Sequence, residues 1–184
     1  MAYGNQVKTD ALSTVYDDEV YPLGTTFMQQ ADEVAAAAHT SSLSDATNPD
    51  NLLGLQGDRT WVFVKAGATV TQYGCCVINA AGTSFVVKDC DADDDEVFDI
   101  VGVSQNGIAT GKYGWIVKTG EVVVLATSVA AGAFLTTDGS TGANGSVDES
   151  TTAGDLIGRA LTATATLPSG STLAGHAGAY ISCP

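Results

Sequence analysis

Hydrophobic and polar residues alternate in short runs over most of the chain after residue 59. The runs are rich in valine, isoleucine and aromatic residues, which favour β-strands. They are residues 60–65, 76–80, 83–89, 97–104, 113–118, 121–127, 133–137, 156–167 and 175–182. They recur about every ten residues with glycine-containing turns between them, a rhythm typical of sandwiches and barrels. The pattern therefore predicts an all-β domain, a small glycine-rich β-barrel or sandwich.

The turns between these runs predict how neighbouring strands connect. Ala81-Gly82 and Asn106-Gly107 are short hairpin signals. Thr119-Gly120 separates two valine-rich runs by only two residues, which predicts a tight hairpin there. Residues 138–154 are polar and rich in glycine and serine, so we expect a long loop over this range.

The N-terminal part of the chain has a different pattern, which places a boundary near residue 58. We expect an N-terminal arm over residues 1–58 and the β-domain over 59–184. Residues 1–26 show little alternation and favour an extended conformation, whereas 27–38 are rich in Ala, Gln and Glu and predict one short helix. Such an arm either lies across a neighbouring subunit or packs on its own domain. The residues expected to contact another chain are Tyr16, Tyr21, Pro22, Leu23 and Phe27.

Charge narrows the range of partners. The chain carries 21 acidic residues against 7 Lys and Arg, for a formal net charge of −14. This charge repels nucleic acid and anionic membranes, and the cations form no basic stripe. No apolar run approaches the ~20 residues of a membrane-spanning helix. The first 26 residues lack the pattern of a secretory signal, so we expect synthesis in the cytoplasm.

Catalytic and metal-binding motifs are weak in this sequence. The acidic run at 89–99 resembles a calcium loop only in its first positions, because Asp94 replaces the required glycine and Ile100 the bidentate glutamate. A loose calcium site or a solvated turn are the two interpretations. His39 and His176 have no nucleophile motif around them. We therefore predict no enzyme, no cofactor and no metal site.

Cysteines and aromatic residues have structural interpretations of their own. The four cysteines form no Cys-x-x-Cys pair and are expected to be small buried hydrophobes. Cys75 and Cys76 are adjacent, so on a strand they would point to opposite faces. Tyr113 and Trp115 lie between glycines and are either core residues or candidates for a trimer interface, where aromatic residues are enriched.

Four segments together resemble the capsid decoration (cement) proteins of tailed bacteriophages. Residues 21–26 (YPLGTT) are similar to the arm that precedes the strands in those proteins, and 61–68 (WVFVKAGA) to the first strand and corner. Residues 100–107 (IVGVSQNG) resemble their central hairpins, and 153–161 (AGDLIGRAL) a late strand. The resemblance covers most of residues 20–182.

The resemblance implies a small barrel of the β-tulip kind that forms a homotrimer on the outer surface of a capsid. It also implies that the arm clamps neighbouring major capsid subunits and that the protein has no catalytic residues. A different class is compatible with the same β pattern, namely a virion fibre, knob or adhesion module that binds a host-surface glycan. Such a module should offer an exposed aromatic or calcium-supported site.

Overall fold

The structure, a computed structural model, describes residues 12–30, 55–79, 84–91, 100–137, 144–150 and 157–183. These residues form strands and no helix, so the predicted all-β class is confirmed. The first six strands are β1 (Thr26–Gln29), β2 (Arg59–Ala66), β3 (Cys75–Ile78), β4 (Val86–Asp89), β5 (Ile100–Ser104) and β6 (Tyr113–Leu125). The others are β7 (Phe134–Thr137), β8 (Val147–Glu149), β9 (Gly158–Ala160), β10 (Ala165–Thr166), β11 (Thr172–Leu173) and β12 (His176–Ser182).

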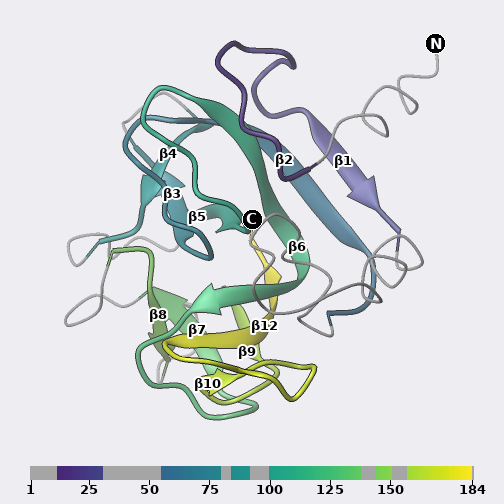
Figure 1. The fold of residues 1–184 in the computed structure, drawn as a ribbon, viewed down its shortest axis with the longest axis vertical. Coiled ribbons are helices and arrows are strands. Elements are labelled where there is room, and N and C mark those ends of the chain that lie inside the picture. The colour runs from purple at the N-terminus through teal and green to yellow at the C-terminus, as the bar shows by residue number, and fades with distance from the viewer. Residues whose placement is uncertain are drawn as a thin grey trace.

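Five strands pair in a closed circuit, which we call the ring. β2 pairs with β4 in parallel, β4 with β3, β3 with β5, β5 with β6, and the N-terminal half of β6 returns to β2 (Figure 1). One cluster of buried side chains receives residues from all five strands and fills the ring. Its members are Val62, Val64, Ala66, Val70, Cys76, Val87, Val101, Ile108 and Ile116. Each strand of a closed circuit has a neighbour on both sides, but β4 covers only Lys65 and Ala66 of β2, so the N-terminal half of β2 keeps a free edge.

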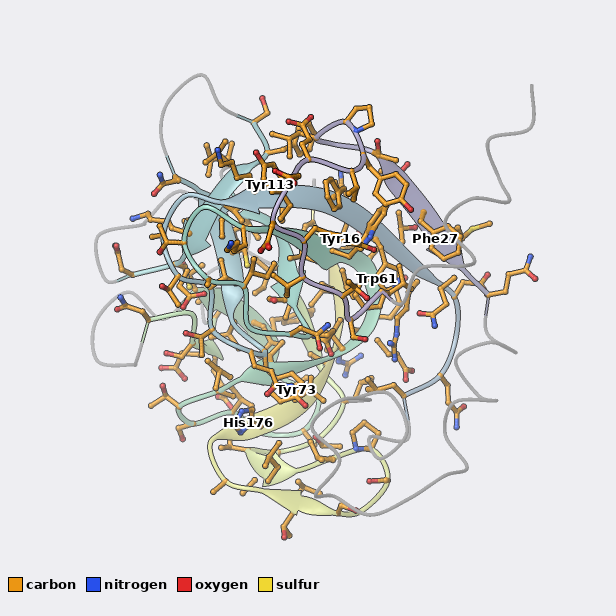
Figure 2. The ribbon with its side chains drawn as sticks, turned by 45° about the horizontal axis from the view of Figure 1, so that its top comes forward. Tyr16, Phe27, Trp61, Tyr73, Tyr113 and His176 are labelled. Atoms are coloured by element: carbon orange, nitrogen blue, oxygen red, sulfur yellow. The ribbon has the colours of Figure 1, made fainter. Side chains whose placement is uncertain are left out.

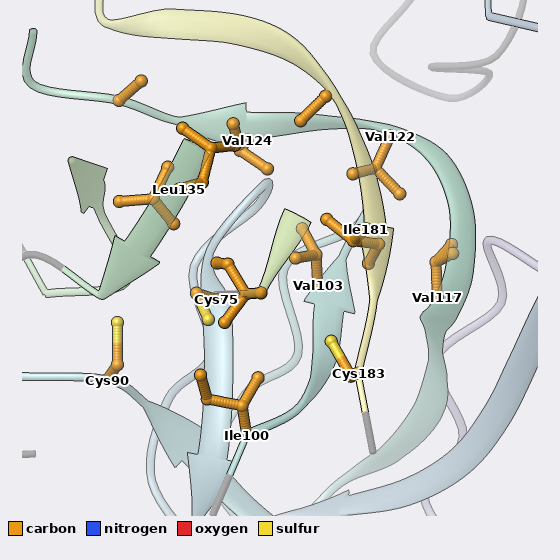
Figure 3. Packing of buried hydrophobic residues seen from close by; sticks show 14 of the residues in the cluster. Cys75, Cys90, Ile100, Val103, Val117, Val122, Val124, Leu135, Ile181 and Cys183 are labelled. Carbon is orange, nitrogen blue, oxygen red and sulfur yellow. The ribbon is translucent and has the colours of Figure 1, made fainter. Parts of the chain in front are cut away.

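The remaining strands extend from β6 as an open sheet. Its order is the C-terminal half of β6, then β12, β9, β7 and β8, and all of these pairs are antiparallel. β10 and β11 form a short hairpin beside β12. The larger hydrophobic core lies between the ring and this sheet, where Cys75 and Val103 meet Val122, Leu135 and Ile181 (Figure 3). The open sheet therefore buries one face, and its other face is not part of this core.

β6 belongs to both regions and corrects one prediction. Thr119-Gly120 does not form a hairpin turn, because residues 113–125 are one continuous strand. Gly120 has φ 122°, in a region that favours glycine. A Cβ on Gly120 would lie 2.7 Å from the carbonyl oxygen of Asp58, closer than two such atoms can approach. Gly120 thus lets the strand change direction, so that its first half pairs with β2 and its second half with β12.

The N-terminal segment also differs from its prediction. Phe27, Met28 and Gln29 were predicted to begin a helix, but they lie in β1, which pairs antiparallel with β2. The free backbone edge of β2 supplies a ladder of hydrogen bonds, and this long-range pairing outweighs local helix propensity. The rest of the predicted helix, residues 31–38, lies outside the described residues.

Smaller differences concern the ends of the strands. The β3–β4 hairpin is confirmed, and its tip at 80–83 lies outside the described residues. The predicted loop at 138–154 contains β8, which pairs with β7. Cys75 and Cys76 point to opposite sides as predicted, because Cys75 packs in the larger core and Cys76 in the ring core.

Candidate functional site

The residues expected to make contacts with other chains lie in one aromatic cluster on the outer side of β2 and β6. Phe63 is its centre, and the ring centroid of Tyr21 lies 5.4 Å from those of both Phe63 and Trp115. Tyr16 packs edge-on against Phe63 at 5.9 Å, and Tyr113 stacks on the same ring at 6.1 Å. Offset and edge-to-face pairs of this kind add stability beyond the apolar area that they bury.

The backbone of residues 12–30 is tied to the domain of the same chain. Tyr16 and Tyr113 exchange two backbone hydrogen bonds, of 2.9 and 3.0 Å. Phe63 receives a bond from the N–H of Gly24 at its carbonyl and donates its own N–H to the carbonyl of Thr25, both at 2.9 Å. The indole Nε1–H of Trp61 donates to Oε1 of Gln29 at 3.0 Å. The segment therefore covers the outer face of β2 as part of the domain.

Most of the residues that were predicted to contact another chain pack against their own chain. Tyr16, Tyr21, Leu23 and Phe27 are half-buried and pack against the core of their own chain, while Pro22 is exposed. The arm was expected either to lie across a neighbouring subunit or to pack on its own domain. Residues 12–30 pack on their own domain. Contact between these residues and another chain stays a prediction.

The two trimer-interface candidates differ in exposure. Trp115 is only 1 % exposed and packs on Phe63 with centroids 5.2 Å apart, so it is a core residue of its own chain. Tyr113 is half-buried, and the Nζ of Lys65 lies 5.3 Å from its ring centroid. A side chain as buried as Trp115 has almost no surface left for a partner.

Exposed hydrophobic side chains lie elsewhere, on surfaces that the sequence analysis did not single out. The large exposed hydrophobic residues of the described chain are Val15, Val20, Met28, Phe134, Leu161 and Tyr180. Phe134 belongs to β7, Tyr180 to β12, and Leu161 directly follows β9. Val15 and Val20 lie at the two ends of the turn that joins Tyr16 to Tyr21. Strand alternation identifies two faces but does not say which one is covered, so no signal in the sequence could mark this set.

Burial in the two cores changes the pKa values of cysteine thiols. Contact with the Cys90 thiol and burial both raise the pKa of the Cys75 thiol well above its usual value. Burial raises the pKa of Cys76 well above its usual value and that of Cys183 to about 12. All four cysteines are free, buried thiols, as predicted. The raised pKa values keep Cys75, Cys76 and Cys183 protonated, which makes these thiols poor nucleophiles and poor metal ligands.

The acidic run and the histidines show no constellation for chemistry in the part of the chain that is described. Burial raises the pKa of Asp89, and hydrogen bonds from the N–H and Oγ1 of Thr71 oppose that rise. Residues 92–99 and His39 lie outside the described residues, and the ring of His176 packs edge-on against Tyr73 (Figure 2). No group of three or more metal-ligating side chains occurs among the described residues.

Within the described ranges, no helix has the length and apolar character needed to cross a membrane.

Comparison with known proteins found similarity to a solved structure. No protein-family model and no curated protein sequence matches the chain. The crystal structure of the head fiber gp8.5 N base in bacteriophage phi29 matches with a TM-score of 0.47 and 15 % sequence identity. The match covers 66 % of this chain and 92 % of that chain. A similarity at this level does not establish a shared function.

Proposed function

We propose that this chain is a structural protein of a tailed-phage virion. In this proposal it binds the outer surface of the capsid as a homotrimer and holds neighbouring major capsid subunits together. The sequence resemblance to decoration proteins suggests the class, and three of the segments that carry it overlap β2, β5 and β9.

The observation that carries the proposal is the distribution of exposed hydrophobic side chains. They gather on the outer face of the open sheet and beside the Tyr16–Tyr21 turn. Exposed aromatic residues next to an arginine, on a rigid sheet, are the composition of protein–protein contacts. Many copies bound to one shell would convert modest contacts into strong attachment. The net charge of −14 suits a position outside the shell, away from packaged DNA.

Binding to shells tests the proposal directly. Purified protein is mixed with capsids of the phage that encodes it, prepared without this protein, and the capsids are sedimented. We expect saturable co-sedimentation and a higher temperature of capsid disruption. Protein that stays in the supernatant at every concentration would contradict the proposal.

Truncation separates the contribution of the N-terminus from that of the domain. Deletion of residues 1–11 leaves every described contact of the Tyr16–Tyr21 segment in place, unlike a deletion to residue 26, which would uncover Phe63 and Trp115. If the N-terminus carries attachment, the shorter deletion abolishes co-sedimentation without changing the free energy of unfolding. Full binding by this variant would assign attachment to the domain itself.

One observation favours the alternative class, a virion module that binds a host-surface glycan. Phe134 and Tyr180 are exposed aromatic side chains, which such a module needs for stacking on sugar rings. Binding to a glycan array that is lost in Tyr180→Ser would support this function. Absence of glycan binding together with binding to shells would exclude it in favour of the structural role.

A further inference from the structure

The outer face of the open sheet carries an ordered row of side chains. The strand register places Arg159 of β9 opposite both Phe134 of β7 and Tyr180 of β12. Residues directly opposite one another in a sheet point to the same side, so the arginine lies between the two aromatic residues. Phe134 is 53 % exposed and Tyr180 47 %, and Leu161, two residues after Arg159, is 39 % exposed. We call Phe134, Arg159, Leu161 and Tyr180 the Arg159 face.

Arg159 is held in place but is not neutralised. Its Nε donates to the carbonyl of Gly132 at 2.9 Å, which fixes the direction of the guanidinium. The ion pairs seen in the described chain are those of Lys88 with Asp91 and of Lys112 with Asp17. None of them involves Arg159, so its remaining N–H groups can take a carboxylate from outside the chain.

A second surface offers the complementary groups. Asp18 and Glu19 are exposed in the turn between Tyr16 and Tyr21, and neither has a hydrogen-bond partner among the described residues. Val15 and Val20, on either side, are 40 % and 49 % exposed. Both tyrosines pack on Phe63, so the turn is presented by a fixed base. We call residues 15–20 the acidic turn.

We propose that the Arg159 face of one copy docks on the acidic turn of a second copy of this chain. The two surfaces match in kind, because each combines exposed hydrophobic side chains with charge of the opposite sign. Together they account for all the large exposed hydrophobic residues of the described chain except Met28. Asp18 and Glu19 stand between exposed hydrophobic side chains, so charge and apolar contact together favour the acidic turn as the surface that Arg159 meets. The inference rests on the self-association in the proposed function and names its surfaces.

The position of the two surfaces sets the type of assembly. In Figure 1 the acidic turn lies at the top of the molecule and strands β7, β9 and β12 lie in its lower half. Two different patches that meet in this way form a head-to-tail contact. Repeated from copy to copy, such a contact gives either a closed cyclic oligomer or an open chain of subunits. Light scattering distinguishes these assemblies. A closed trimer has a constant mass of about 56 kDa, three times 18.7 kDa, whereas the mass of an open series grows with concentration.

Charge reversal tests the contact on the full chain. Arg159→Glu should raise the dissociation constant for self-association by at least about tenfold, as read from mass against concentration. Glu19→Arg should weaken self-association in the same way. Combining the two changes in one chain should restore self-association to within about threefold of the wild type, because every contact then re-forms the pair with opposite polarity.

Met28→Asp is the matched control, since Met28 is 58 % exposed on β1, outside both surfaces. Phe134→Asp should reduce the mass to that of a monomer, and Met28→Asp should leave it unchanged. A wild-type protein that is monomeric at all concentrations, or charge reversals that leave the mass unchanged, would overturn the inference. Sedimentation with shells is a separate readout, so a monomer that still binds shells refutes this contact and leaves the proposed attachment intact.

Discussion

The ring and the open sheet are built from the same kind of strand, but they differ in how much of their outer surface is covered. The ring closes on itself around its own core, and the N-terminal segment covers the outer face of β2. The open sheet buries its inner face fully and its outer face only in part. Its outer face is covered near Val123 and Gly178 by Leu167 and Pro168, while Phe134 and Tyr180 stay exposed.

This difference separates stability from interaction. Where the N-terminal segment covers the ring, aromatic side chains serve packing, as Trp115 and Tyr21 do. In the open sheet, aromatic side chains lie in solvent, where burying them against a partner would be favourable. Residue type therefore does not decide whether an aromatic side chain is core or interface. What decides is whether other parts of the chain cover the sheet face on which the side chain lies.

The largest effect is expected from Trp115, at the centre of the covered face. Trp115→Ala should lower the free energy of unfolding by about 3–5 kcal/mol, because it removes a fully buried ring. Trp115→Phe keeps an aromatic ring and removes a buried Nε1–H that has no acceptor in the described part of the chain, so it should cost less. Urea denaturation measures the free energy of unfolding of both variants. An equal loss in the two would contradict the packing of the Trp115 ring in the aromatic cluster.

The junction between the two regions should be nearly as sensitive. Gly120→Ala should cost about 2–4 kcal/mol, since it combines an unfavourable φ with a contact to the Asp58 carbonyl. Gly111→Ala is the control, because Gly111 also has a positive φ but nothing lies within 4 Å of the added Cβ. Thermal denaturation that shows the same loss for both variants would mean that close approach at residue 120 is unimportant.

The covering segment should contribute less than the core. Tyr21→Ala should lower the free energy of unfolding by about 1–3 kcal/mol and shift tryptophan emission to longer wavelength, as water reaches Trp115. Pro22→Ala next to it should change neither quantity beyond about 0.5 kcal/mol, because Pro22 is exposed. A Tyr21→Ala protein with wild-type stability and emission would show that residues 12–30 do not pack on the domain.

The smallest effect is a dependence on pH from Asp89 in the ring. Its pKa is raised by burial, so the native state is stabilised relative to the unfolded state when the carboxyl is protonated. That contribution is full below the ordinary pKa of 3.8 and is lost as pH rises through the raised value. Asp89→Asn lacks this titration. The unfolding free energy of the wild type minus that of the variant should therefore fall as pH rises above 3.8. A difference that rises over this range would give the shift the opposite sign.

Local sequence signals identified the strands well. Alternation and β-branched residues located β2, β5, β7 and β12, because these signals depend on each residue and its near neighbours. Two features depended on distant partners. Thr119-Gly120 has the spacing of a hairpin turn, and only the separate pairings with β2 and β12 make it a bend within one strand. Residues 27–29 favour helix locally, but they complete the edge of β2.

The candidate site was harder to predict for the same reason. Tyr16, Tyr21 and Phe27 have the composition of an interaction arm, and nothing local shows that Phe63 and Trp115 lie beneath them. Arg159 has an ordinary sequence context and becomes distinctive only when the register places it between Phe134 and Tyr180. Which face of a sheet is covered is decided by contacts between residues far apart in the chain.

Side-chain oxidation by hydroxyl radicals tests the central claim most directly, because it reads the exposure of individual Phe, Tyr and Met side chains. The protein is labelled when dilute and again when it is concentrated or bound to shells. The account predicts that oxidation of Phe134 and Tyr180 falls on assembly, while that of Met28 is unchanged. Protection of Met28 with undiminished oxidation of Phe134 and Tyr180 would contradict the claim that the exposed face of the open sheet takes part in the interaction.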